Sequence, residues 1–125
     1  MASRWSFEQL AERAFALDPG VRWVAVGWPG QAPRWTYRPG VQSLNPDATD
    51  EAEERLVNPA ILALAGARGD WDLDGLQFVV LAYGKLTQVI ARLPGGGHIS
   101  ASLGSEVDAS RVGKELVRLA TMADA

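Results

Sequence analysis

Apolar and polar residues follow one another along this chain at spacings that predict helices and strands. Ser6 and Gln9 have the spacing of a capping box and begin a helical pattern of apolar residues, which the turn at 18–20 ends. β-branched and aromatic residues fill positions 21–28, which predicts a buried strand. Positions 34–38 alternate between aromatic and polar residues, which indicates a half-exposed strand at or near a sheet edge.

A second helical pattern begins at 47–50 and continues to about Arg68, with Gly69 expected to end it. Pro59 lies inside this pattern and leaves two possibilities open. Either the helix kinks at Pro59, or Asn58 caps a fresh helix that has Pro59 as its first residue. We favour a short acidic helix or turn that leads into the main helix at Asn58.

The main part of this second helix is apolar on every side. Val57, Ile61 and Leu64 form one stripe, Leu62 lies away from it, and small residues fill most of the remaining positions. A helix that is apolar all round must be covered from more than one side. A chain of this size should not need to bury such a helix completely, so the pattern predicts a surface that meets another protein.

The remaining segments predict a meander and a final helix. Two apolar runs at 76–83 and 86–93 are separated by two turn residues, which is typical of a β-hairpin. A glycine-rich turn at 94–97 leads into a third strand at 98–103. Asp108 then has the position of an N-cap for the last helix.

This order of elements predicts the α/β (α+β) fold class. We expect an α-β-β-α-β-β-β-α sandwich with a central five-stranded antiparallel sheet and helices on both faces. A length of 125 residues is typical of one domain.

Composition and charge narrow the classes of function. The chain is 47% hydrophobic and 22% charged, as expected for a globular protein, and its net charge of -3 is spread evenly, which argues against nucleic acid as a partner. It contains no cysteine, which excludes disulfides and thiolate metal sites. No apolar run approaches the ~20 residues that span a bilayer, and Glu8 and Glu12 interrupt the N-terminal pattern where a secretory signal would be apolar. We expect a cytoplasmic protein without membrane insertion.

The segment at 70–75 has the opening pattern of a calcium-binding loop. Asp70, Asp72 and Asp74 occupy its first, third and fifth positions, and Gly75 its sixth. The twelfth position, which should supply a bidentate glutamate, is Leu81. The ligand set is incomplete, so we interpret the segment as a polar turn between helix and strand and predict no metal site.

His98, Ser100 and Ser102 share one face of the third meander strand and could in principle form a nucleophile–base pair. No nucleophile elbow or oxyanion-hole motif accompanies them, so we interpret the face as solvated and predict no enzymatic activity. The glycines at 94–97 precede a strand, whereas a phosphate cradle needs a following helix. The sequence therefore predicts no cofactor.

The segment order resembles the roadblock / dynein light chain family, which is related to the longin and profilin-like folds. The resemblance extends over nearly the whole chain. Its most specific parts are the hairpin at 76–93, the strand at 98–103 and the helix at 110–119, with the pair Val112 and Gly113 near the start of that helix.

The resemblance implies a single roadblock-like domain over 1–125 and a homodimer in which the second helix and the third strand of each copy pair. It also implies a non-catalytic role as a regulator or scaffold of a small Ras-like GTPase, or of a motility or signalling complex. The residues predicted to form the dimer interface are Ala60, Ile61, Leu62, Ala63, Leu64, Gly66, Ala67, Val79, Leu81 and Tyr83.

An alternative function stays open at this point. Profilin-like sheets can also hold small molecules, and five tryptophans in this chain is heavy usage. In a small-molecule sensor module of this kind, Trp23, Trp28, Trp35 and Tyr37 would line an aromatic pocket.

Overall fold

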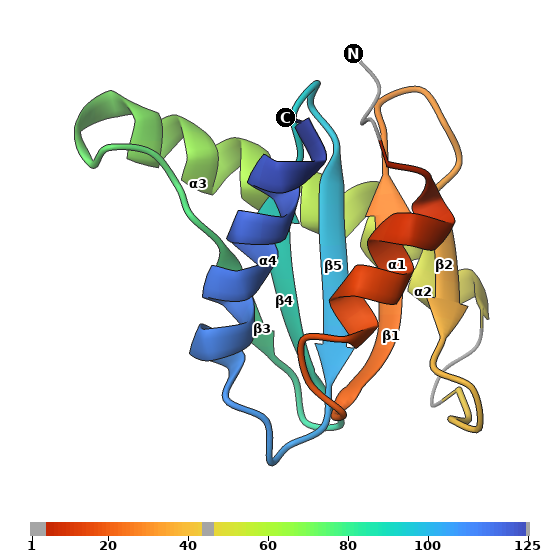
Figure 1. The fold of residues 1–125 in the computed structure, drawn as a ribbon. Helices are drawn as coiled ribbons and strands as arrows, with labels where there is room; N and C mark the ends of the chain where they lie inside the picture. Colours follow the sequence, from red (N-terminus) through yellow and green to blue (C-terminus); the bar gives the residue numbers. More distant parts are fainter. Residues whose placement is uncertain (1–4, 44–46, 125) are drawn as a thin grey trace.

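The computed structural model describes residues 5–43 and 47–124 (Figure 1). The helices and strands are α1 (Phe7–Phe15), β1 (Val21–Gly27), β2 (Arg34–Tyr37), α2 (Asp47–Ala52), the π-helical turn η1 (Glu53–Val57), α3 (Asn58–Asp72), β3 (Val79–Ala82), β4 (Thr87–Arg92), β5 (His98–Leu103) and α4 (Ala109–Asp124). The predicted order of helices and strands is confirmed.

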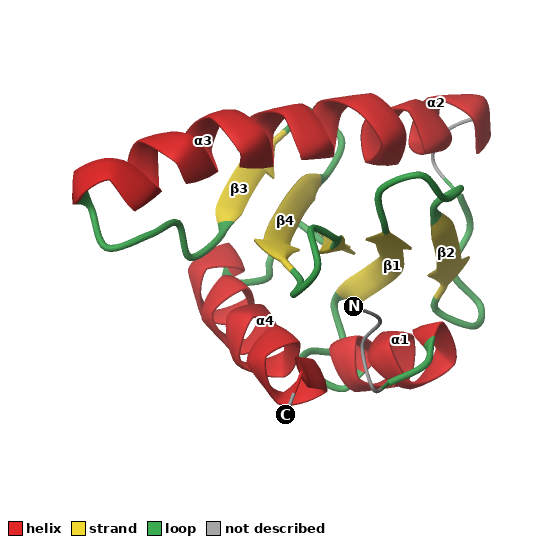
Figure 2. Cartoon of the chain, turned by 90° about the horizontal axis from the view of Figure 1, so that it is seen from above, coloured by secondary structure: helices red, strands yellow, loops and turns green. Residues whose placement is uncertain are grey.

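The five strands form one antiparallel sheet in the order β2-β1-β5-β4-β3. The predicted edge position of the strand near 34–38 is therefore correct, and β3 forms the opposite edge. Figure 2 shows α1 and α4 on one face of the sheet and α2, η1 and α3 together across the other. The fold class predicted from the sequence, a sandwich with helices on both faces, is confirmed.

The apolar core lies between the sheet and the α1/α4 layer. Leu10 of α1, Val24 of β1, Ile99 of β5 and Leu116 of α4 belong to it and are at most 1% exposed. Both short-range caps expected on this side are present. The Ser6 hydroxyl accepts a hydrogen bond from the Gln9 amide, and Asp108 caps α4 in the same way.

Residues 47–72 form one continuous helical segment, which we call the long helix. Asn58 has helical dihedral angles (φ -63°, ψ -46°), and its N–H donates to the carbonyl of Glu53, five residues earlier. The favoured interpretation of Asn58 as an N-cap is therefore wrong. Proline lacks an N–H and crowds the carbonyl four residues before it, and the widened turn η1 lies where Pro59 would disturb a regular helix.

The end of the long helix also differs from the prediction. α3 passes through Gly69 and ends at Asp72. Gly69 is needed for a close approach, because a Cβ there would lie 2.9 Å from the backbone nitrogen of Leu76 in the returning chain. The positive φ of Gly75 (+89°) turns the chain instead, and the Gly75 N–H donates to the Gly69 carbonyl at 3.0 Å.

β3 is shorter than the predicted run 76–83, because the residues before Val79 pack elsewhere. Phe78 lies against α4, where a Cβ on Gly113 would be only 2.4 Å from its ring. Gly113 thus lets α4 lie directly over Phe78 at the start of the meander.

Candidate functional site

The outward side of the long helix carries a continuous apolar surface. Leu56 is 68% exposed, Leu64 is 75% exposed and Trp71 is 82% exposed, and Ala60, Ala63 and Ala67 between them are exposed as well. At about 100° per residue, these side chains fall within an arc of about 100°. We call this surface the outer stripe; it consists of Leu56, Ala60, Ala63, Leu64, Ala67 and Trp71.

The ten residues predicted to form an interface occupy different positions on this framework. Five of them are exposed, namely Ala60, Ala63, Leu64, Ala67 and Tyr83. Three are partly buried, namely Ile61, Val79 and Leu81, and two are buried, namely Leu62 and Gly66. Leu62 is 6% exposed and faces inward, while Gly66 leaves room for the Arg92 guanidinium, 2.9 Å from where its Cβ would be. The structure thus brings Ala60, Ala63, Leu64 and Ala67 together on the outer stripe, whereas Tyr83 follows β3, and Leu62 and Gly66 lie on the buried side of the helix.

The strand β3 lies at the free edge of the sheet on the side of the long helix. Among the described strands, β4 is its one neighbour. Val79 and Leu81 are partly buried, and Val80, on the opposite face of the strand, is 38% exposed. An edge strand with unpaired backbone groups can accept another strand and so extend the sheet.

Tyr83, just beyond β3, connects this edge to the long helix. Its hydroxyl lies 3.1 Å from each carboxylate oxygen of Glu53 and donates to that group. Burial raises the pKa of Glu53; the Tyr83 hydrogen bond opposes this, and the charges of Glu54 and Asp50 add to it. Burial and the neighbouring Glu53 raise the pKa of Tyr83 in turn.

The raised pKa of Glu53 predicts how stability depends on pH. A carboxyl whose pKa is higher in the folded state binds its proton more tightly there, so its contribution to stability falls as pH rises above the unfolded value near 4.5. At neutral pH the Glu53 charge is therefore a net cost. We expect Glu53→Gln to be at least as stable as the wild type at pH 7, with a smaller decline between pH 4.5 and 7, measured by urea unfolding.

Glu12→Gln on the exposed side of α1 is the matched control for removing a carboxylate away from the Glu53–Tyr83 contact. A Glu53→Gln protein clearly less stable than the wild type at pH 7 would show that the carboxylate stabilises the fold.

His98, Ser100 and Ser102 are buried, at 4%, 0% and 5% exposure, so the predicted solvated face is wrong. β5 is a central strand and the long helix covers this face. Glu54 reaches down from η1: its Oε1 lies 2.8 Å from His98 Nε2, and its Oε2 accepts a hydrogen bond from the Ser100 hydroxyl at 2.9 Å. We call Glu54, His98 and Ser100 the buried cluster. The serine bonds to the carboxylate and not to the imidazole, which is not the arrangement of a serine nucleophile with its base.

Glu54 was missed because its sequence context is a run of acids that suits an exposed helix start. Its inward direction depends on where η1 crosses the sheet. Gly27 offers a clearer signal: a Cβ there would lie 2.5 Å from the His98 ring, so this glycine makes space for the imidazole beside Glu54.

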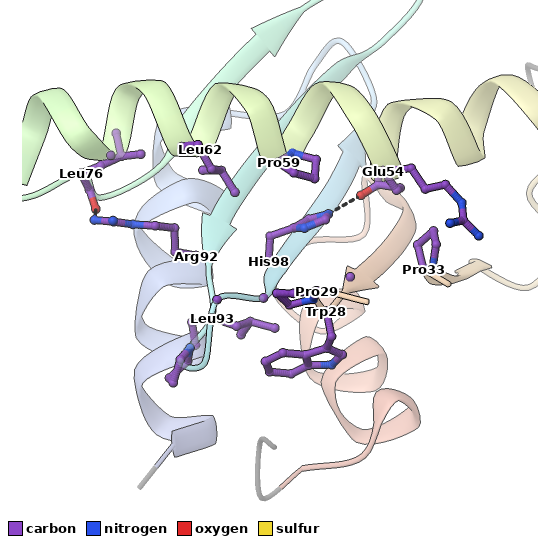
Figure 3. Close-up of a pocket in the computed structure, with 18 of the residues that line it drawn as sticks. Trp28, Pro29, Pro33, Glu54, Pro59, Leu62, Leu76, Arg92, Leu93 and His98 are labelled. Carbon is purple, nitrogen blue, oxygen red and sulfur yellow. Dashed lines mark hydrogen bonds and ion pairs between the residues drawn. The ribbon is translucent and has the colours of Figure 1, made fainter. Parts of the chain in front are cut away.

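An open groove of about 1390 Å³ lies between the long helix, the β1–β2 loop and the β4–β5 turn. Figure 3 shows Pro59 and Leu62 on one side of it, Trp28 and Leu93 on the other, and His98 between them. Glu54 and His98 of the buried cluster line this groove.

The acids of the calcium-like segment do not converge. Asp70 lies 3.4 Å from the Arg92 guanidinium, and Asp72 forms an ion pair with Arg68 one turn back. Asp70 and Asp72 belong to α3, and Asp74 follows it with a positive φ of 61°. Among the described residues, no three acidic or histidine side chains are grouped so as to hold a metal ion.

The four aromatic residues of the sensor hypothesis do not line one pocket. Trp23 packs against Trp35 and Tyr37, with ring centroids 6.5 and 6.3 Å apart, and none of these three lines the groove. Trp28 contributes both to the groove and to a separate cavity of about 400 Å³ beside Trp5.

No described helix has the length and apolarity needed to cross a lipid bilayer.

Comparison with solved structures identifies the fold. A roadblock/LC7 domain from Streptomyces avermitilis is 16% identical, with 94% of each chain covered and a TM-score of 0.68. The gliding protein MglB from Thermus thermophilus is 13% identical, with 93% of this chain and 89% of that one covered and a TM-score of 0.61. MglB in a tetrameric arrangement is 12% identical, with 93% and 88% covered and a TM-score of 0.62.

These matches confirm the resemblance predicted from the sequence: the chain has the roadblock/LC7 fold. No protein-family model matches the sequence, and no curated protein matches it significantly. Identities of 12–16% establish the fold and assign no residue a role.

Proposed function

We propose that this chain is a non-catalytic protein-interaction module, a single roadblock-like domain over 1–125, that forms a homodimer through the long helix and β3. The observation that carries the proposal is the outer stripe, in which Leu56, Leu64 and Trp71 are each more than two-thirds exposed. Contiguous exposed apolar surface on a small protein is typical of an interaction site.

The free edge of β3 makes a second copy of the chain the best-fitting partner. Two copies that pair antiparallel at β3 continue the sheet from one molecule into the other, and a two-fold axis there places both long helices on the same face. Ala60, Ala63 and Ala67 lie on the outer stripe and allow close contact between helices, because the distance between packed helices depends on side-chain size.

For the partner beyond the dimer, we propose a small Ras-like GTPase or a motility or signalling complex in the cytoplasm. Support comes from the roadblock fold and from the fact that one protein with this fold is a gliding protein. The dimer would act as a regulator or a scaffold, since it would present the same surfaces twice.

The first experiment is to measure the mass of the wild-type protein by light scattering and sedimentation up to high micromolar concentration. We expect twice the chain mass of 13.4 kDa, because the outer stripe would otherwise be exposed to water. A particle that keeps the mass of one chain at high micromolar concentration would remove the basis of the dimer.

A further inference from the structure

The two faces of the sheet are packed by different chemistry. The apolar core fills the α1/α4 side, and among its described members none belongs to the long helix. On the opposite side, Trp23 Nε1, both amide atoms of Asn58 and Gln88 Oε1 are buried and have no hydrogen-bond partner among the protein atoms. Trp23 and Gln88 flank Ser102 in the strand register, so these groups belong to the layer under the long helix.

Buried polar groups without partners make this layer costly to close. Each such group loses its hydrogen bonds to water on burial, which is unfavourable. Water that enters on opening would hydrate all three residues again. The layer under the long helix therefore contains more buried polar groups than the apolar core on the other face.

The long helix itself contributes few buried apolar side chains to this layer, which also contains Trp23, Ala25 and Ile90 of the sheet. Leu62 is the one apolar side chain of its described residues that is buried; the other buried positions of α3 are Asn58, Gly66 and Gly69. The two glycines contribute no side-chain area. The groove of about 1390 Å³ further separates α3 from the adjoining loops.

Polar contacts attach the long helix instead. Asp50 accepts from the Tyr37 hydroxyl at 2.7 Å, Glu53 accepts from Tyr83, and Asp70 meets Arg92 at 3.4 Å. These residues are partly or largely exposed, and exposed pairs contribute little. The buried cluster is different, because Glu54 is 1% exposed, its Oε1 lies 2.8 Å from His98 Nε2, and its Oε2 accepts a hydrogen bond from the Ser100 hydroxyl at 2.9 Å.

We propose that the long helix is a separate opening unit, fastened to the sheet by the buried cluster, that leaves the sheet while α1, α4 and the strands β1, β4 and β5 stay folded. Local opening of this kind is expected where the opening element contributes few buried apolar side chains and the adjoining core is complete. The consequence for regulation rests on the proposed function: the outer stripe lies on this unit, so a partner that binds it would select the closed position.

Native-state hydrogen exchange at increasing urea tests the opening. In the wild type, the amides of α3 should exchange through an opening of low denaturant dependence, while those of β5 should exchange only with global unfolding. Glu54→Gln keeps the shape of the side chain and replaces one carboxyl oxygen by an amide group, so the contacts with His98 and Ser100 can no longer both be made as they are. We expect about tenfold faster exchange in α3 and no change in β5.

Val112→Ala is the matched control, because Val112 is a core residue of α4 at 0% exposure. It should speed exchange of the core strands and leave the local opening of α3 unchanged. The proposal fails if α3 and β5 of the wild type exchange with the same free energy and the same urea dependence. It also fails if Glu54→Gln speeds both equally. Should this variant not fold, the wild-type comparison decides alone.

Repeating the measurement at several protein concentrations separates this proposal from the dimer. Slower exchange of α3 at higher concentration supports both. Opening of α3 that is independent of concentration, with β5 still protected, supports the opening unit and contradicts a dimer through the outer stripe.

Discussion

Replacing Leu64 by glutamate is expected to convert the dimer into a folded monomer. Leu64 is 75% exposed in the single chain, so a charge there meets water and leaves the fold intact. In a two-fold interface the substitution counts twice, because each copy contributes the same residue. Losing the burial of two leucines costs about 1.5–3 kcal/mol each, and two glutamates would face one another. Together these effects weaken the dimer by at least about 10²-fold.

Sedimentation at matched concentrations measures this change, and thermal unfolding at low concentration checks the fold. Met122→Glu is the control, because Met122 is 50% exposed on α4, on the other side of the sheet. It should leave the mass of the particle unchanged. A Leu64→Glu protein that still sediments as the wild-type dimer would show that the copies associate through another surface.

Replacing Leu116 by alanine is expected to lower the free energy of unfolding by about 2–5 kcal/mol, because Leu116 is 0% exposed in the core and its truncation leaves a cavity. Leu64→Ala is the matched control. It makes the same chemical change in a helix, so helix propensity shifts equally, yet the side chain is exposed and the expected loss is within about 0.5 kcal/mol.

Urea unfolding at low concentration, where dimerisation does not contribute, compares the two variants. Equal losses at the two positions would contradict the assignment of the α1/α4 layer as the main source of stability.

The sequence was sufficient where a local rule sets the structure. The capping box at Ser6, the cap at Asp108 and the hairpin between β3 and β4 each depend on residues a few positions apart. The sequence also showed that the second helix is apolar on every side and must therefore be covered from more than one side. Which side of that helix faces the sheet was not visible.

The side of the second helix that faces the sheet decides which substitution can test dimerisation. Leu62 looked like an interface residue because it lies off the Val57–Ile61–Leu64 stripe, and a charge there would seem to test dimerisation. At 6% exposure it faces the sheet, so Leu62→Glu would bury a charge and unfold the region whether or not a dimer forms. Leu64→Glu separates the loss of the dimer from the unfolding of the chain, because Leu64 is exposed in the single chain.

The sequence by itself determined the order of elements, the caps at Ser6 and Asp108 and the fold class, because periodicity and capping act over one or two turns of the chain. Only the tertiary structure decided that Glu54 meets His98 and Ser100, that Gly69 admits the returning chain and that Leu64 faces outward. These contacts join residues far apart in sequence, and their geometry depends on where the long helix crosses the sheet, which no local spacing specifies.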